Sequence, residues 1–179
     1  MVYVLLGTGF EETEAITPID LMRRAGIPVL TVGLNGKTVV GSHGIGVVAD
    51  ITAEEMDLTQ MEMVVLPGGL GGVSSIRGSK PAMDAIQFAH DNGKLTAAIC
   101  AGPTVLADLG ITNGRKAVCY PGCEDAMGSA LMLSEAAVQD GSLITGASAG
   151  CAVKFGLALI SALKGEAAAK AVADQIVIR

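Results

Sequence analysis

One short segment holds the residue best suited to covalent chemistry. Cys100 follows an apolar run, Leu95–Ala98, that predicts a buried strand, and it precedes a segment that predicts a helix. Ala98 and Gly102 flank it at two residues on either side, and a tight strand-to-helix turn requires such small residues. The pattern predicts a nucleophile elbow that exposes Cys100 beside the positive end of a helix, where a thiolate is favoured. The alternative is a cysteine that only fills space in the core.

Three carboxyl groups are candidates for controlling the proton of this cysteine. Glu11, Glu12 and Glu14 begin the first predicted helix. Acidic residues in a first helical turn often only complement the helix dipole, and we expect that role for at least two of them. A carboxyl beside a thiolate is useful when it is protonated or when it carries a proton to and from substrate. The residues alone do not select which of the three has that role.

Glycines follow a second predicted strand, Met63–Leu66. Gly68 and Gly69 would allow backbone N–H groups to approach a developing oxyanion, with the N–H of Ala101 as the second donor. The alternative is a tight turn that binds nothing. The segment is not a phosphate loop, because no Gly-Lys-Ser/Thr sequence follows it.

Neither of the two histidines is expected to complete a conventional catalytic triad. His90 lies near the end of a predicted helix, Ser79–Asn92, remote from the carboxyl ends of the strands. His43 lies in a small predicted antiparallel ribbon formed by Thr38–Val40 and Ile45–Val48.

The other cysteines predict no metal site. Cys119, Cys123 and Cys151 accompany Cys100, and zinc would require four ligands. We therefore expect no metal, and free thiols in a reducing cytoplasm. Cys119 or Cys123 could act as a resolving thiol, although a buried structural role is the simpler interpretation of both.

Composition excludes several classes of protein. The 179 residues are most simply one domain, spanning 1–179, and the net charge of −6 argues against a nucleic-acid partner. The apolar stretches are much shorter than the roughly 20 residues of a membrane span, so we expect no membrane partner. Residues 1–7 lack the basic region of a signal peptide and predict a first strand, which favours a cytoplasmic location.

Short apolar runs alternate with helical patterns along the chain, which predicts an α/β domain with a mainly parallel sheet. The predicted strands are Val2–Leu6, Pro28–Gly33, Met63–Leu66, Leu95–Ala98, Ala117–Tyr120 and Leu143–Thr145. The predicted helices are Glu11–Ala25, a short one from Thr52 to Met56, Ser79–Asn92, Ala152–Leu163 and Glu166–Ala173, with Ile176–Ile178 as an edge strand or tail. Ligands of such folds bind at the carboxyl ends of the strands. Three segments meet there: Gly7–Glu14, Pro67–Gly72 and Cys100–Gly102.

Taken together, these segments resemble the DJ-1/ThiJ/PfpI family over essentially the whole chain. The resemblance rests on Gly9–Ala15, Asp20–Ile27, Leu66–Gly69 and Ala97–Pro103, and the EETEA sequence places it nearer the DJ-1-like branch than the PfpI proteases. It implies a flavodoxin-like three-layer sandwich with a nucleophile elbow, and a homodimer.

The resemblance also implies roles for individual residues. Cys100 would be the oxidation-prone nucleophile and Glu14 the carboxyl hydrogen-bonded to it. Gly69 and Ala101 would supply the oxyanion N–H groups. It implies no cofactor.

Two features depart from the family pattern. Tyr120 stands before Pro121 where many members have a histidine, which puts a Cys-His-Glu hydrolase mechanism in doubt and makes peptidase activity unexpected. Ser148 lies in a segment, Thr145–Gly150, that in DJ-1-like members often contains arginine and proline. We expect Gly68, Tyr120 and Ser148 to line the pocket, whose substrate choice differs accordingly.

Two functions follow from the resemblance. The first is a cysteine-dependent, cofactor-independent enzyme that acts on small reactive carbonyls in stress protection, as a glyoxalase or deglycase. The alternative is a redox-sensing stress protein or chaperone in which Cys100 is oxidised without turnover. Conversion of methylglyoxal separates the two.

Overall fold

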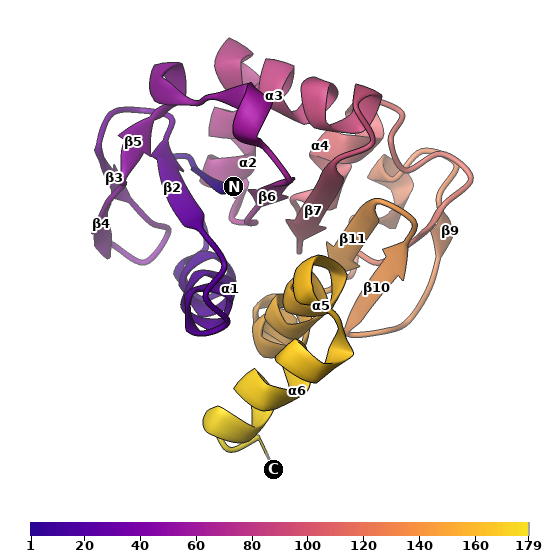
Figure 1. Ribbon diagram of the computed structural model, residues 1–179. Coiled ribbons are helices and arrows are strands. Elements are labelled where there is room, and N and C mark those ends of the chain that lie inside the picture. Colours follow the sequence, from indigo (N-terminus) through magenta and orange to yellow (C-terminus); the bar gives the residue numbers. More distant parts are fainter. Residues whose placement is uncertain (179) are drawn as a thin grey trace.

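The computed structural model describes residues 1–178, and its centre is a seven-stranded sheet (Figure 1). The strand order is β10-β11-β7-β6-β1-β2-β5. These strands are β1 (Val2–Leu6), β2 (Val29–Gly33), β5 (Ile51–Thr52), β6 (Met63–Leu66), β7 (Leu95–Ile99), β10 (Ala137–Asp140) and β11 (Leu143–Gly146). All neighbours pair in parallel except β10 and β11, which are antiparallel. The predicted mainly parallel α/β fold is confirmed.

Six helices cover the two faces of the sheet (Figure 1). They are α1 (Glu12–Arg24), α2 (Leu70–Gly78), α3 (Lys80–Asp91), α4 (Pro103–Asp108), α5 (Ala152–Lys164) and α6 (Glu166–Gln175). Helices α1, α5 and α6 lie on one face, and α2, α3 and α4 lie on the other. This arrangement makes three layers.

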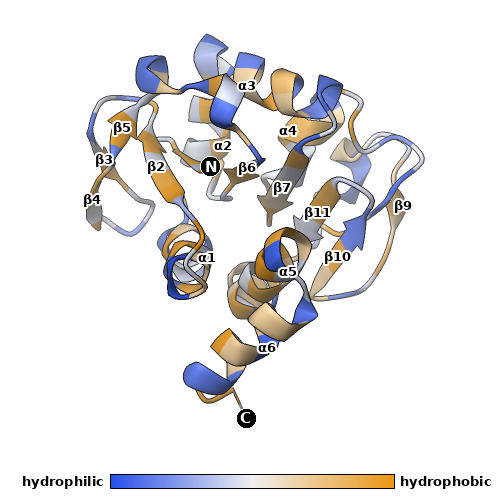
Figure 2. Ribbon diagram, in the orientation of Figure 1, coloured by the Kyte–Doolittle hydropathy of each residue, from blue (hydrophilic) through white to orange (hydrophobic). Residues whose placement is uncertain are grey.

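The central strands are apolar because helices cover both of their faces. Along β1, Val2, Val4 and Leu6 pack with α1 and α5, whereas Tyr3 and Leu5 pack with α2 and α3. This alternation is the period of two that a strand imposes. Figure 2 shows β2, β6 and β7 as mostly hydrophobic, whereas the surrounding helices carry both kinds of residue. Burial on both faces accounts for the continuous apolar runs in the sequence.

Close packing of α1 against α5 fixes the position of the first helix. A Cβ atom at Gly156 of α5 would lie 2.8 Å from Leu21 Cδ1 and 3.1 Å from Pro18 Cα. Only glycine allows the two backbones to come this close. The start of α1 is thereby held at the carboxyl end of the sheet, where Cys100 lies.

One predicted strand, Ala117–Tyr120, is largely wrong. Only Lys116–Ala117 (β8) is a strand, and it pairs with β9 (Leu131–Met132) outside the main sheet. The backbone of the next residues bonds elsewhere: the Val118 N–H donates to Thr145 Oγ1 at 2.9 Å, and the Tyr120 N–H donates to the Cys100 carbonyl at 2.9 Å. Tyr120 is therefore in a loop beside the elbow.

Helix α2 was not predicted, because its first turn is rich in glycine. A Cβ at Gly72 would lie 2.7 Å from Phe10 Cα, and a Cβ at Gly71 would lie 2.9 Å from the Thr8 carbonyl oxygen. These glycines allow the helix to pack against the loop after β1, a tertiary reason that helix propensity does not reveal. The described structure has a turn rather than a strand at Ile176–Ile178.

Most of the remaining elements agree with the prediction. The ribbon of β3 (Thr38–Val40) and β4 (Gly46–Val48) is antiparallel. The segment after Thr52 is a 3₁₀ turn, Ala53–Glu55, with the predicted capping box. The short strands β5, β9 and β10 were missed. Among residues 1–178, no helix combines the length and the apolar character that crossing a membrane requires. The expectation of a single domain over 1–179 stays a prediction.

Candidate active site at the carboxyl end of the sheet

Cys100 occupies a strained turn between β7 and α4, as the elbow pattern predicts. Its φ of 65° lies in the left-handed region, which costs a non-glycine residue about 1–2 kcal/mol. Hydrogen bonds hold this conformation, since the Cys100 N–H donates to the Gly146 carbonyl at 2.9 Å and its carbonyl accepts from the Tyr120 N–H. A Cβ at Gly102 would lie 2.7 Å from the Leu66 carbonyl oxygen, so the small residue is required.

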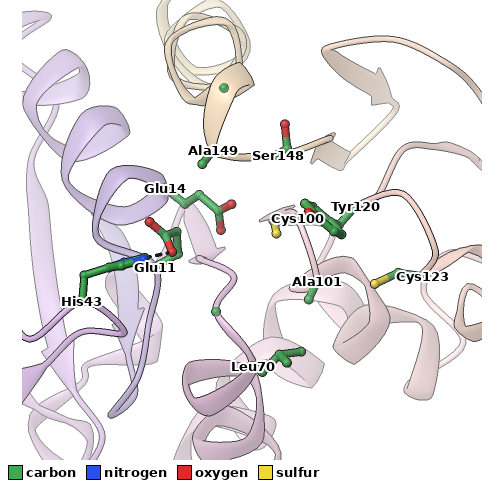
Figure 3. Close-up of a pocket in the computed structure, with 12 residues that line it drawn as sticks. Glu11, Glu14, His43, Leu70, Cys100, Ala101, Tyr120, Cys123, Ser148 and Ala149 are labelled. Carbon is green, nitrogen blue, oxygen red and sulfur yellow. Dashed lines mark ion pairs between the residues drawn. The ribbon is translucent and has the colours of Figure 1, made fainter.

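Glu14 is the carboxyl that meets the cysteine. It lies in the first turn of α1, its side chain is buried, and it hydrogen-bonds the Cys100 thiol. Figure 3 shows the two side chains pointing toward one another. Its Oε2 also accepts the Gly68 N–H at 2.9 Å, and the Gly68 carbonyl accepts the Glu11 N–H at 3.0 Å. The structure therefore brings Glu14 to Cys100, as the resemblance implies.

Gly68 holds the Glu14 side chain of this pair through its backbone N–H. It does not line the cavity, contrary to our expectation, and its N–H binds Glu14 instead. A Cβ at this position would overlap Glu14 Oε2 and lie 2.7 Å from Cys100 Cβ. Glycine is needed here because the backbone passes close to the side chains of Glu14 and Cys100.

Burial and mutual repulsion control the protons of the pair. Burial and the neighbouring charge of Glu14 raise the pKa of Cys100 to about 12. Burial also raises the pKa of Glu14 above its ordinary value. The pair therefore resists holding two negative charges at once.

This result differs from the expectation that the turn favours a thiolate. The N–H groups of Ala101 and Gly69 do lower the pKa of Cys100, but burial and Glu14 outweigh them. When the shared proton is on Glu14, the sulfur is the thiolate, and a carboxyl donor and two N–H donors then face it. The proton is thus placed by the whole pair and not by the helix end alone.

Gly69 and Ala101 direct their N–H groups at the sulfur. Gly69 has a φ of +84°, and a Cβ there would lie 2.6 Å from the Glu11 nitrogen. The positive φ and the close approach both require glycine. Two preorganised N–H donors are the arrangement that stabilises an oxyanion forming next to the nucleophile.

These groups open into a cavity of about 640 Å³ (Figure 3). Its wall combines small, apolar and acidic residues: Glu11, Glu14, His43, Gly69, Leu70, Cys100, Ala101, Tyr120, Cys123, Ser148, Ala149 and Gly150. Tyr120, half-exposed, and Ser148 line it as expected. This volume suits a small substrate.

Sequence reasoning missed the place of His43 in this wall. His43 Nδ1 lies 3.0 Å from Glu12 Oε2 and 3.5 Å from Glu11 Oε2, and the His43 N–H donates to Glu12 Oε1 at 2.8 Å. The bond to Glu12 raises the pKa of His43. Burial of Glu12 would raise its own pKa, but the hydrogen bonds from His43 prevail and lower it to about 2. Only the folding of the ribbon onto α1 brings these residues together.

Among the described residues, Glu11, Glu12 and His43 form the one group whose potential metal ligands lie within 4.8 Å of one another. Ser42 and His43 already hydrogen-bond the two carboxylates. Exposed acidic groups of this kind are common without an ion. We therefore assign no metal to it.

Comparison with known proteins agrees with this geometry. The model of the DJ-1/PfpI family matches residues 1–162. Protein dj-1beta of Drosophila melanogaster is 35% identical over 178 residues, which are 98% of this chain and 95% of that protein. The crystal structure of a DJ-1 superfamily protein from Salmonella typhimurium has a TM-score of 0.94 at 33% identity, with 99% of this chain and 98% of that chain covered.

A protein named as a deglycase, from Pyrococcus abyssi, is 32% identical over 126 residues, which are 70% of this chain and 75% of that protein. The match of the family model over most of the chain, and relatives above 30% identity along nearly all of it, settle the classification. The chain belongs to the DJ-1/PfpI family.

Proposed function

We propose that this protein is a cysteine-dependent, cofactor-independent enzyme that acts on small reactive carbonyls, of the glyoxalase or deglycase type. The observation that carries the proposal is the contact of Cys100 with Glu14, with the N–H groups of Gly69 and Ala101 at the same sulfur. The similarity to the Pyrococcus abyssi protein named as a deglycase supports the same class of substrate.

The first step would be the addition of the Cys100 sulfur to an aldehyde carbon. The aldehyde oxygen becomes negatively charged as the C–S bond forms, and the N–H groups of Gly69 and Ala101 would stabilise that charge. The proton that Glu14 carries would then reach this oxygen, which gives a neutral hemithioacetal and leaves Glu14 as a carboxylate.

The second step would use the carboxylate as a base. With methylglyoxal, Glu14 would remove the hydrogen from the carbon that bears sulfur and return it to the neighbouring carbonyl carbon. The proton of the hemithioacetal hydroxyl moves to the ketone oxygen in the same conversion, so the hemithioacetal becomes a thioester and the ketone an alcohol. Water then hydrolyses the thioester to lactate and restores the thiol. The reaction is an internal oxidation and reduction, so it consumes no external oxidant or reductant.

The cavity wall favours an uncharged substrate. It contains no lysine or arginine, and its one basic residue, His43, is already paired with Glu11 and Glu12. Glu11 and Glu14 lie on the same wall. An anionic aldehyde would find no free cationic group in this wall, whereas a neutral dicarbonyl needs none.

The experiment that tests the proposal is lactate formation from methylglyoxal without added glutathione. We expect turnover by the wild type and none above the buffer rate by Cys100→Ala. Cys151→Ala is the matched control, because Cys151 is half-buried but does not line this cavity. Equal activity in the Cys100 variant would remove Cys100 from the mechanism. An inactive wild type whose Cys100 is still readily oxidised would favour the redox-sensing alternative.

The homodimer implied by the family resemblance is also a proposal. Sedimentation equilibrium of the purified protein tests it, and a monomer at micromolar concentration would contradict it.

A further inference from the structure

We propose that Cys123 is a resolving thiol for Cys100: after a hydroperoxide oxidises Cys100, Cys123 forms a disulfide with it. This inference rests on the reactivity of Cys100 that the proposed function requires. The inference adds Cys123 to the site as a second redox-active residue. Oxidation of Cys100 would then end in a disulfide that a thiol can reduce.

The cavity selects Cys123 from the three remaining cysteines. Cys100 and Cys123 line the same cavity, and Figure 3 shows both sulfur atoms there. Cys119 is buried and lines a different cavity of about 500 Å³, together with Cys151. The sequence leaves Cys119 and Cys123 open as resolving thiols, and the fold separates them onto different sides of one loop.

Backbone hydrogen bonds connect the two cysteines through a single residue. The Tyr120 N–H donates to the Cys100 carbonyl at 2.9 Å, and the Tyr120 carbonyl accepts the Cys123 N–H at 2.9 Å. Cys123 is therefore tied to the elbow by two consecutive bonds. Cys119 directly precedes Tyr120 and shares this connection, but its side chain is buried and lines the other cavity.

The loop that carries Cys123 is free to adjust. Residues 120–126 are exposed except for Cys123, whose side chain is half-buried. Gly122 makes the turn with a φ of +94° and has open space around it. A disulfide places its two Cα atoms about 5.5–6 Å apart. An exposed turn can supply the movement that this geometry demands more easily than the buried elbow can.

The chemistry balances with one hydroperoxide. The Cys100 thiolate attacks the peroxide oxygen, the O–O bond breaks, and hydrogen peroxide yields the sulfenic acid and hydroxide. The Cys123 sulfur then attacks the Cys100 sulfur, an S–S bond forms, and the sulfenic oxygen leaves as water with the proton of the Cys123 thiol. Two thiols lose two electrons in total, and the peroxide gains them. The disulfide prevents a second oxidation of Cys100 to the irreversible sulfinic acid.

The test is peptide mapping of the full chain after treatment with two equivalents of hydrogen peroxide and blocking of free thiols; the disulfide consumes one equivalent, and sulfinic acid requires both. Trypsin separates Cys100, in residues 95–115, from the other three cysteines, which share residues 117–154. We expect the wild type to lose about 2 Da and to give these two peptides cross-linked, with both separated again by dithiothreitol.

Single variants identify the partner. Cys119→Ser and Cys151→Ser should still form the cross-link, whereas Cys123→Ser should lose it and gain about 32 Da on residues 95–115, as sulfinic acid. Circular dichroism of Cys123→Ser checks that the fold is kept. A cross-link that survives in Cys123→Ser, or wild type that gains the sulfinic acid with Cys123 free, would overturn the inference but leave the reactive Cys100 intact. Wild type in which Cys100 remains unmodified would overturn both the inference and the reactivity behind the proposed function.

Discussion

The pKa values of two carboxyl groups in the first turn of α1 shift in opposite directions. Glu12 and Glu14 are two residues apart and both buried, with 6% and 1% of their surfaces exposed. The hydrogen bonds of His43 and the ribbon lower the pKa of Glu12 to about 2. Burial raises the pKa of Glu14, whose partners are the Cys100 thiol and the backbone N–H groups of Gly68 and Ala149. Both side chains are hidden from solvent, but Glu14 lies deeper in the protein, and its few donors do not offset the desolvation that raises its pKa. Glu12 lies nearer the surface and has enough donors to lower its pKa.

The difference separates a structural carboxylate from a proton carrier. Glu12 is satisfied by donors that hold it ionised, so it anchors the β3–β4 ribbon to α1 and has no proton to give. Glu14 contacts the Cys100 thiol, and burial raises its pKa, so it holds a proton more readily than an ordinary carboxyl and is suited to acid–base work. The following changes test this contrast.

Glu14→Gln should have the largest effect. An amide of the same size keeps the packing but cannot carry the proton, so kcat/KM for methylglyoxal should fall by about 10²–10⁴-fold. Alkylation of Cys100 by iodoacetamide should persist, because the sulfur and its N–H donors remain. Activity within a few-fold of the wild type would show that Glu14, like Glu12, does not transfer a proton in the reaction.

A pair of glycine variants compares the two sides directly. A Cβ at Gly68 would overlap Glu14, and a Cβ at Gly41 would overlap Glu12. Gly68→Ala should displace the Cys100–Glu14 pair and lower kcat/KM by about 10²-fold. Gly41→Ala should destabilise the fold by about 1–3 kcal/mol in urea unfolding, with activity nearly unchanged. Equal losses of activity in both would contradict the division of roles.

Glu12→Gln should change stability and its dependence on acid. Because folding lowers the pKa of Glu12 from 4.5 to about 2, its carboxylate stabilises the fold above about pH 4.5 and this contribution is lost as the pH falls toward 2. At pH 6 the variant should lose about 1–3 kcal/mol of unfolding free energy, the usual value of hydrogen bonds to a charged group. In urea titrations, the difference in unfolding free energy between the wild type and the variant should become smaller below pH 4.5. A difference that stays constant at every pH would contradict the conclusion that ionised Glu12 stabilises the fold.

His43→Asn should have the smallest effect. The pKa of His43 is raised by Glu12, so its charged form stabilises the fold below the ordinary value of 6.5, and this contribution is lost as the pH rises through the raised pKa. The variant should lack that alkaline decline when the melting temperature is measured from pH 5.5 to 8.5. Because the His43 side chain is exposed and pairs with Glu11 and Glu12 rather than with Cys100, turnover should stay within about threefold of the wild type. A larger loss of turnover would place His43 in the reaction.

The elements that were predicted well are those with a local physical signature. The continuous apolar run Met63–Leu66 is a central strand because both of its faces are covered. The small residues around Cys100 are needed by a turn whose φ is 65°. Helix α2 and the loop around Tyr120 were mispredicted because their backbone conformations depend on Phe10, Thr145 and Cys100, which are distant in the sequence.

The sequence by itself determined the parallel α/β fold and the place of Cys100 in a tight turn, because apolar periodicity and steric demands at a turn act over a few residues. The family followed from the motifs that the chain shares with its relatives. From the residues alone, Glu11, Glu12 and Glu14 were equivalent candidates. Only the tertiary structure shows how they differ: the packing of α1 against α5 directs Glu14 to Cys100, and the ribbon gives Glu12 its donors. A pKa depends on which charges and dipoles meet in space, and folding alone decides that.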